Sequence, residues 1–342
     1  MIRLSSIGDI ILTTPLLRNL KRTYPEAEID FVVKKKFQEI LYGNPNISNI
    51  IPFDDKNGLS ELRRIKKAIV QKKYDWLLDI HKNLRSVYLR TCSGAKKRFR
   101  YKKEMIRRFL LIRFKLNYYQ TIVPIYRRYM IELESFGIHD DAKGLDIYVD
   151  PIAKERVTGR WGSFFEKFPL LVGLVPGAGY ATKRWLPEGF ARVGERLMRE
   201  NGAGIILFGG PDDLALHEEI LNRMNGEALA LAGKTSLQES IAAMTFCTCI
   251  ISNDTGLMHV AVALKKKLVA IFGATTEELG FFPCAKEQII LQNNGLSCRP
   301  CTHIGSDGCP KAHFKCMEEI SAEDVYRAAT KLSTKGNYKV PL

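Results

Sequence analysis

Long apolar runs are missing from this chain of 342 residues. No window of 18 or more apolar residues occurs, so we expect no membrane-spanning helix. A secretory signal is lacking as well, because Gly8 and Asp9 interrupt the partly apolar stretch Met1–Leu17 and no small-residue cleavage site follows. These absences predict a cytoplasmic protein. Its length is sufficient for two domains of ordinary size.

Acidic residues are scarce in the first half of the chain. Residues 1–150 contain 30 Lys and Arg against 17 Asp and Glu, whereas residues 151–342 contain 22 against 20. The extreme is the segment 96–115, in which Glu104 alone opposes ten basic residues. Nucleic acid, a phosphorylated glycolipid and an anionic membrane surface are the candidate partners, beside a plain solvated face. Interleaved apolar residues predict a basic amphipathic helix here, which favours the membrane surface.

A disulfide framework is not expected from the eight cysteines of a cytoplasmic chain. Four of them follow the spacing C-x2-C-x7-C-x6-C: Cys298, Cys301, Cys309 and Cys316. A structural zinc site, one or two local disulfides and reduced thiols in a packed loop all remain open. A catalytic metal is less favoured, since no carboxylate cluster lies beside them.

Apolar runs alternate with helical patterns, which predicts parallel sheets covered by helices. Residues 145–166 read as a connector, and the alternation restarts after it. Strands are expected at Ile29–Val33, Trp76–Ile80, Leu170–Val175, Gly204–Gly209, Cys249–Ser252 and Lys267–Gly273, and helices at Ile10–Tyr24, Leu59–Gln71, Pro187–Glu200, Asp213–Met224 and Ser321–Ser333. Two Rossmann-like halves are therefore predicted, with ligands at the carboxyl ends of the strands.

The strand at Cys249–Ser252 leads into Asp254, Thr255 and Gly256, and a helix is predicted directly afterwards at Leu257–Leu264. Glycine permits close backbone approach, and the free N–H groups of a helix N-terminus attract anions, so this loop is suited to a diphosphate. His259 is expected about one turn inside the helix. An ordinary turn with a helix cap is the alternative.

Several segments together resemble glycosyltransferase family 9, the ADP-heptose type heptosyltransferases of lipopolysaccharide core synthesis. The resemblance extends over nearly the whole chain and is carried by Ser5–Pro15, Asp79–Ser86, Pro176–Ala178, Lys183–Pro187, Phe208–Pro211, Ala232–Leu237 and Asn253–His259. It implies a GT-B fold of two Rossmann-like domains facing across a cleft. Residues 1–150 would bind the acceptor and residues 151–320 the nucleotide sugar, while residues 321–342, a helix and tail, would pack back on the first domain.

The resemblance also implies an inverting sugar transfer with named roles. Asp9 matches the base that takes the proton of the acceptor hydroxyl, and Lys183 matches the lysine that neutralises the donor phosphates. The donor-binding residues implied are Thr235, Asp254, Thr255, Gly256, His259 and, more loosely, Asp213. Lys82 and Arg85 match basic groups on the acceptor side. Considered locally, Asp9 is a helix cap, Asp213 a helix N-terminal acid, and the basic residues solvated surface.

The resemblance further implies an anionic glycolipid acceptor, such as a Kdo-bearing lipid A core, met at the inner membrane surface through residues 96–115. Lys183, helix amides and Arg184 would stabilise the departing diphosphate, so we expect no obligatory metal or other cofactor. A nucleotide-sugar epimerase of the same shape is the alternative. A nucleic-acid binder is disfavoured because residues 151–342 are nearly neutral, and we expect no nucleic-acid partner. Only Met1–Leu4 precede the first motif, so either the first strand is short or the given sequence begins inside it.

Overall fold

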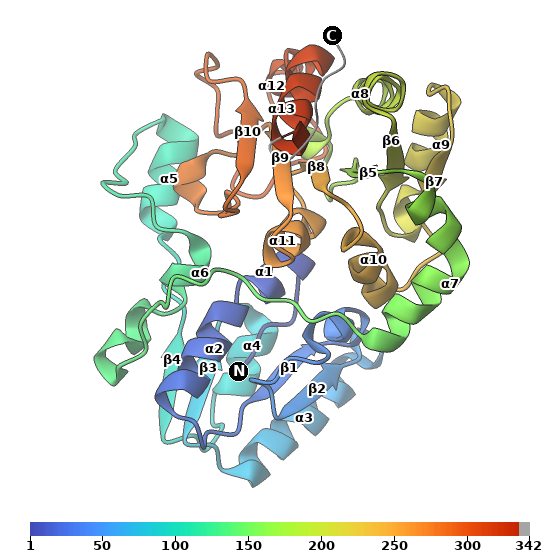
Figure 1. Ribbon diagram of the computed structural model, residues 1–342. Helices are drawn as coiled ribbons and strands as arrows, with labels where there is room; N and C mark the ends of the chain where they lie inside the picture. Colours follow the sequence, from blue (N-terminus) through green and yellow to red (C-terminus); the bar gives the residue numbers. More distant parts are fainter. Residues whose placement is uncertain (335–342) are drawn as a thin grey trace. The chain divides into compact units, whose positions relative to one another are not determined.

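The computed structural model describes residues 1–334 (Figure 1) and divides into two α/β units. Unit 1 consists of Met1–Glu104 and Val123–Tyr148. Unit 2 consists of Met105–Ile122 and the chain from Val149 onward. Within residues 1–334 no helix is both long enough and apolar enough to cross a membrane.

Unit 1 is built on short parallel strands. Its elements are α1 (Ile7–Ile11), α2 (Thr14–Thr23), β1 (Asp30–Lys34), η1 (Lys35–Leu41), β2 (Asn49–Phe53), η2 (Asp55–Asn57), α3 (Gly58–Lys72), β3 (Trp76–Asp79), α4 (Leu84–Arg90), β4 (Lys97–Arg100), α6 (Ile125–Arg128) and η3 (Ile131–Phe136). The ladders pair β1 with β2 and β3 with β4. Residues 1–4 lie between the two pairs, since Ile2 bridges Val32 of β1 and Asp79 of β3 in parallel. Residues 1–4 thus join the two strand pairs through isolated bridges at Ile2 rather than through a regular strand.

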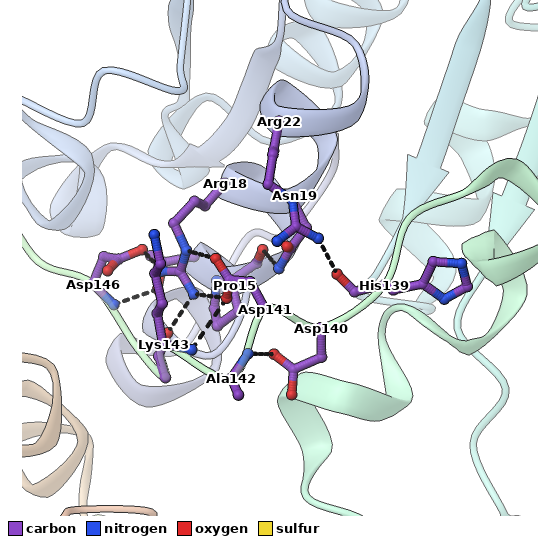
Figure 2. Close-up of polar contacts among 12 residues, drawn as sticks. Pro15, Arg18, Asn19, Arg22, His139, Asp140, Asp141, Ala142, Lys143 and Asp146 are labelled. Carbon is purple, nitrogen blue, oxygen red and sulfur yellow. Dashed lines mark hydrogen bonds and ion pairs between the residues drawn. The ribbon is translucent and has the colours of Figure 1, made fainter.

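A polar clamp fastens the end of unit 1 to α2 (Figure 2). The Arg18 guanidinium donates to both carboxylate oxygens of Asp141 at 2.7 and 2.8 Å, and it also pairs with Asp146. It donates to the Gly144 carbonyl as well, at 2.9 Å. A fork of this kind is among the stronger hydrogen-bonding arrangements in proteins. The clamp therefore holds the segment that leads out of unit 1 against the helix following α1.

Unit 2 contains a six-stranded parallel sheet with the order β10-β9-β8-β5-β6-β7. Its elements are α5 (Met105–Phe114), α7 (Pro151–Lys167), β5 (Leu170–Val175), η4 (Ala181–Lys183), α8 (Pro187–Asn201), β6 (Ala203–Leu207), η5 (Pro211–Asp213), α9 (Leu214–Asn222), β7 (Ala228–Ala230), α10 (Leu237–Met244), β8 (Cys249–Asn253), α11 (Gly256–Ala263), β9 (Lys267–Phe272), η6 (Glu277–Leu279), β10 (Gln288–Gln292), α12 (Lys315–Glu318) and α13 (Ala322–Thr334). The central strands β5, β6 and β8 are buried along their whole length, as parallel strands covered by helices must be.

Helix α13 packs against α8 and strands β8, β9 and β10 of unit 2 (Figure 1). The packing of the C-terminal helix on the first domain, which the resemblance implies, stays a prediction. Val325, Ala329 and Leu332 lie on one face of the helix and join the core made by β8 and β9. Their spacing buries an apolar stripe on the nearest sheet. Residues 335–342, the expected tail, lie outside the described residues.

The expected connector at 145–166 is wrong over most of its length, because Pro151–Lys167 forms helix α7. The Asp150 side chain caps this helix by accepting a hydrogen bond from the Ile152 N–H at 3.0 Å, and Pro151 is its first residue. Ala153 and Val157, four residues apart, face the interior. Two glycines and three β-branched residues weakened the helical pattern in the sequence.

The basic segment 96–115 is not one helix. Its first part forms β4 in unit 1, and Met105–Phe114 forms α5, which belongs to unit 2 rather than to the first domain. The charge difference between the units is consequently smaller than between the sequence halves. Unit 1 carries 26 Lys and Arg against 16 Asp and Glu, and unit 2 carries 26 against 21.

Candidate active site

In unit 1, Asp9 is held at the start of α1, immediately after the middle strand of the sheet. Its Oδ2 lies 2.6 Å from Nη2 of Arg3 and accepts hydrogen bonds from the Ser6 hydroxyl and backbone N–H at 3.0 and 3.3 Å. The Asp9 side chain keeps 21% of its surface exposed. The carboxylate thus has the local capping contact that the sequence suggested, and it remains accessible to solvent.

Arg3 is the residue that ties Asp9 to the sheet, and it was not singled out from the sequence. Its Nη1 donates to the Ile80 carbonyl at 2.8 Å and its Nε to the Ser5 carbonyl at 2.8 Å. Burial by itself would raise the pKa of Asp9. The Arg3 charge and hydrogen bond, with the Ser6 donors, outweigh burial and hold the pKa of Asp9 below its ordinary value.

The acceptor-side residues follow β3, whose carboxyl end lies near Arg3. Lys82 has a left-handed backbone, with φ of 53°, and its N–H donates to the buried Asp79 carboxylate at 2.8 Å. Arg85 is exposed at the start of α4, with its guanidinium 5.7 Å from the Phe53 ring centroid. Between β3 and Lys82 lies His81. Burial, followed by the Arg3 charge, lowers the pKa of His81 to about 4, so its imidazole is neutral at neutral pH.

In unit 2, the donor residues expected from the resemblance all follow the carboxyl ends of neighbouring strands. Lys183 follows β5, Asp213 follows β6, Thr235 follows β7 and Asp254 follows β8. From β5 the chain adds β6 and β7 on one side of the sheet, and it then returns to add β8, β9 and β10 on the other side of β5. Adjacent loops diverge at such a reversal, which is where open parallel sheets bind ligands.

The centre of this edge is a buried ion pair. Lys183 Nζ lies 2.7 Å from Asp254 Oδ2, with the two side chains 14% and 5% exposed. The same Asp254 oxygen accepts a hydrogen bond from the Thr275 hydroxyl at 2.8 Å. Thr275 follows β9 and is itself buried. The lysine amine is thereby fixed beside the loop that begins α11, in a poorly solvated position where its charge acts strongly on an anion.

Asn253, the last residue of β8, ties the two loops of the ion pair together. Its Nδ2 donates to the Pro176 carbonyl at 2.7 Å, and its Oδ1 accepts the Trp185 N–H at 3.2 Å. Pro176 and Trp185 flank Lys183 on the loop that follows β5. Since Asn253 is fully buried, the spacing between the Lys183 loop and the α11 loop is set by side-chain hydrogen bonds.

Asp213 lies against Gly177 so closely that a Cβ at Gly177 would sit 2.4 Å from Oδ1 of Asp213. The carboxylate also accepts the Gly210 N–H at 2.9 Å, which is the local helix-terminal role foreseen for it. The Thr235 side chain also has a nearby hydrogen-bonding partner, since its hydroxyl lies 2.7 Å from the Ser240 hydroxyl.

Thr255 is the N-cap of α11, Gly256 its first residue, and His259 is buried one turn inside the helix. The helix therefore presents its N-terminal N–H groups next to Asp254, as the sequence predicted.

The four clustered cysteines are thiols rather than disulfides. Cys301 Sγ lies 3.2 Å from the Cys298 carbonyl oxygen, and Cys298 Sγ lies 3.8 Å from His313 Nε2. Within residues 1–334 no group of three or more His, Cys, Asp or Glu side chains is placed to hold a metal ion.

Arg3, Asn253 and Thr275 are the residues that sequence reasoning missed. None of them stands out locally, because their partners are distant along the chain: Arg3 binds the Ile80 carbonyl, and Thr275 binds Asp254. One signal was available for Asn253, which directly precedes the Asp-Thr-Gly loop and falls within a segment already selected.

The fold and these two sets of residues define a two-unit α/β protein whose second unit carries polar and charged side chains at the carboxyl edge of a parallel sheet. A sequence model of glycosyltransferase family 9 (heptosyltransferase) matches residues 62–310, and the chain belongs to this family. It is accordingly a glycosyltransferase, as the resemblance predicted, and the epimerase and nucleic-acid alternatives are set aside.

Relatives of known sequence or structure agree with this assignment. The chain is 28% identical to lipopolysaccharide heptosyltransferase 2 of Salmonella typhimurium over 290 residues, covering 80% of this chain and 82% of the relative. The crystal structure of a glycosyl transferase family 9 protein from Veillonella parvula matches with a TM-score of 0.82 and 27% identity over 98% of this chain and 96% of that one. The E. coli ADP-heptose lps heptosyltransferase II shares the fold, with a TM-score of 0.76, 22% identity and 97% coverage of both chains. The predicted α/β GT-B fold class is confirmed.

Proposed function

We propose that this protein transfers heptose from a nucleotide-diphosphate heptose to an anionic lipopolysaccharide-core acceptor, with inversion at the anomeric carbon. The observation that carries the proposal is the buried Lys183–Asp254 pair at the strand reversal of unit 2. A fixed cation beside a helix N-terminus is suited to a diphosphate. ADP-heptose is the donor we expect, from the family resemblance and from the description of the E. coli relative.

The chemistry assigns one task to each unit. An oxygen of the acceptor hydroxyl attacks the anomeric carbon while the bond from that carbon to the diphosphate oxygen breaks. Asp9, kept ionised by Arg3, accepts the hydroxyl proton. Lys183 and the first N–H groups of α11 stabilise the charge that develops on the departing diphosphate. Asp254 orients the lysine, and Lys82 and Arg85 bind anionic groups of the acceptor.

The proposal includes a cytoplasmic location at the inner membrane surface. The acceptor named for the curated relative is lipopolysaccharide, whose precursor is anchored in a membrane, so the enzyme needs access to that surface. The net positive charge of unit 1 favours both an anionic acceptor and an anionic leaflet.

Calorimetric binding of ADP, UDP and GDP in the presence of EDTA tests the donor site. We expect ADP to bind best, and Lys183→Gln to weaken its affinity about tenfold or more, since hydrogen bonds to charged groups contribute about 1.5–3 kcal/mol. Lys167→Gln is the matched control, because Lys167 is an exposed lysine of unit 2 at the end of α7. Equal affinities for wild type and Lys183→Gln, or no nucleotide binding at all, would overturn the proposed donor site.

A further inference from the structure

Helix α5 presents an apolar face to solvent. Met105, Ile106 and Phe109 are 57%, 77% and 57% exposed, although each is a large hydrophobic residue. Leu111 is buried, so the helix is apolar toward the protein and toward solvent as well. The exposed side chains continue at Phe114, the last residue of the helix, and at Leu116 beyond it, which are 57% and 47% exposed. Exposed apolar groups gathered in this way mark an interaction surface.

Basic side chains border this apolar face, and the segment itself contains no acidic residue. Residues 105–122 contain four Lys and Arg and no Asp or Glu. The Arg113 guanidinium lies 5.9 Å from the centroid of the Phe114 ring, which itself packs edge-on against Phe109 at 5.8 Å. Aromatic rings flanked by arginines are typical of segments that lie at the boundary between lipid headgroups and acyl chains.

The earlier part of the basic segment is different, because its charges are engaged within unit 1. Lys96 pairs with Asp75 at 2.6 Å and Lys102 with Glu132 at 2.7 Å. Lys97 lies 4.3 Å from the centroid of the Phe136 ring. Within residues 96–115, it is therefore helix α5 that combines basic side chains with an exposed apolar face.

The helix is also anchored firmly to unit 2. Lys115 Nζ donates to the carbonyls of Cys298 and Pro300 at 2.9 and 2.7 Å, and Asn117 Nδ2 donates to Glu278 at 3.1 Å. These hydrogen bonds fix the segment that follows α5 to the rest of unit 2.

We propose that α5 is a membrane-docking element. Met105, Ile106 and Phe109 insert among the lipids of an anionic bilayer, while Arg108 and Arg113 contact the headgroup phosphates. This inference rests on the proposed lipid-anchored acceptor and deepens it, because attachment is assigned to apolar insertion at one helix rather than to the charge of residues 96–115. In such helices, the buried apolar area and the attraction of basic residues to anionic lipids both contribute to membrane binding.

Co-sedimentation with phosphatidylethanolamine–phosphatidylglycerol vesicles tests the inference, using the full chain. Ile106→Ser combined with Phe109→Ser should weaken vesicle binding about tenfold or more, since both changes remove apolar area that would be buried among the lipids. Leu59→Ser combined with Ile152→Ser is the control, because both side chains are exposed on other helices, and it should bind as the wild type does. Wild-type binding should persist in part at about 1 M salt, where the Debye length is about 3 Å.

Three results would overturn the inference. One is unchanged binding of the Ile106→Ser, Phe109→Ser variant, and another is complete loss of wild-type binding in high salt. The third is a change in self-association of that variant in sedimentation, which would assign the apolar face to a second copy of the chain. Heptosyl transfer to a soluble, deacylated acceptor separates the two proposals: the variant should retain it, and its loss would place α5 in the acceptor site instead. Vesicle binding that depends on α5, with no transfer by the wild type, would refute the proposed function and leave this inference standing.

Discussion

Arg3 Nη2 lies 2.6 Å from Asp9 Oδ2, so the carboxylate assigned as the base is held by a guanidinium from the strand that precedes it. The same guanidinium donates to the Ile80 carbonyl at the carboxyl end of β3, where the acceptor-side residues begin. Arg3 therefore has two effects: it positions Asp9 and keeps it ionised.

Replacing Arg3 should change the pH dependence of transfer. In Arg3→Gln, burial continues to raise the pKa of Asp9 but the opposing charge is gone, so the acid limb of the kcat/KM profile should move to higher pH. Arg3→Lys keeps the charge and should leave the limb closer to that of the wild type. The measurement is kcat/KM across pH for the three proteins. An acid limb that is identical in all of them would contradict the account.

Thr275 should matter for donor binding although no sequence motif contains it. Thr275→Val keeps the side-chain shape but removes the hydrogen bond to Asp254, so Lys183 loses part of its fixed position. We expect a loss in ADP affinity of about 3- to 30-fold, and Thr275→Ser should restore it. Thr245→Val is a control on the same unit, since its hydroxyl bonds only the Ala242 carbonyl among the described contacts. Equal affinities for the valine and serine variants would refute the role.

Stability at mildly acidic pH should report the neutral state of His81. The folded pKa of about 4 is below the unfolded value of 6.5, so between these values the unfolded chain binds a proton that the folded chain does not. The free energy of unfolding therefore falls as pH decreases from about 6.5 toward 4. Urea unfolding at pH 7 and pH 5 should show a smaller pH dependence in His81→Gln than in the wild type. An equal dependence in both proteins would show that His81 is not held neutral.

Metal removal should leave the reaction intact. The leaving diphosphate is assigned to Lys183 and the α11 amides, so we expect EDTA to change the transfer rate less than about twofold, well below the several kcal/mol that a metal contributes where it is required. Transfer after dialysis against EDTA, with and without added Mg²⁺, is the measurement. Loss of transfer that Mg²⁺ restores would show that a divalent ion has to be added to the mechanism.

Elements with a strong local pattern were predictable from the sequence. The strand at Leu170–Val175 is fully apolar and was located to the residue, because a parallel strand buried on both faces has no polar interruption. Strands β7 and β10 were not predicted, since their half-exposed residues give neither a continuous apolar run nor a clean alternation.

The same distinction applies to the candidate site. The Asp254–Gly256 loop was located because strand, turn and helix follow one another within about ten residues. The ion pair that Asp254 forms with Lys183 joins residues 71 positions apart, counted from their numbers. The contacts of α13 with α8, β8, β9 and β10 could not be predicted for a related reason: an apolar stripe indicates that a helix is buried but not which surface it packs against.

The most direct test of the account is heptosyl transfer by Asp9→Asn, compared with the wild type and with Asp55→Asn, a control at a partly exposed carboxylate of unit 1. The assay would follow the heptosylated product of an anionic core acceptor by mass spectrometry. We predict that the wild type and Asp55→Asn form the product, and that Asp9→Asn is slower by about 10²- to 10⁴-fold while its ADP affinity is unchanged. Wild-type rates in Asp9→Asn, or no product from the wild type, would contradict the central claim.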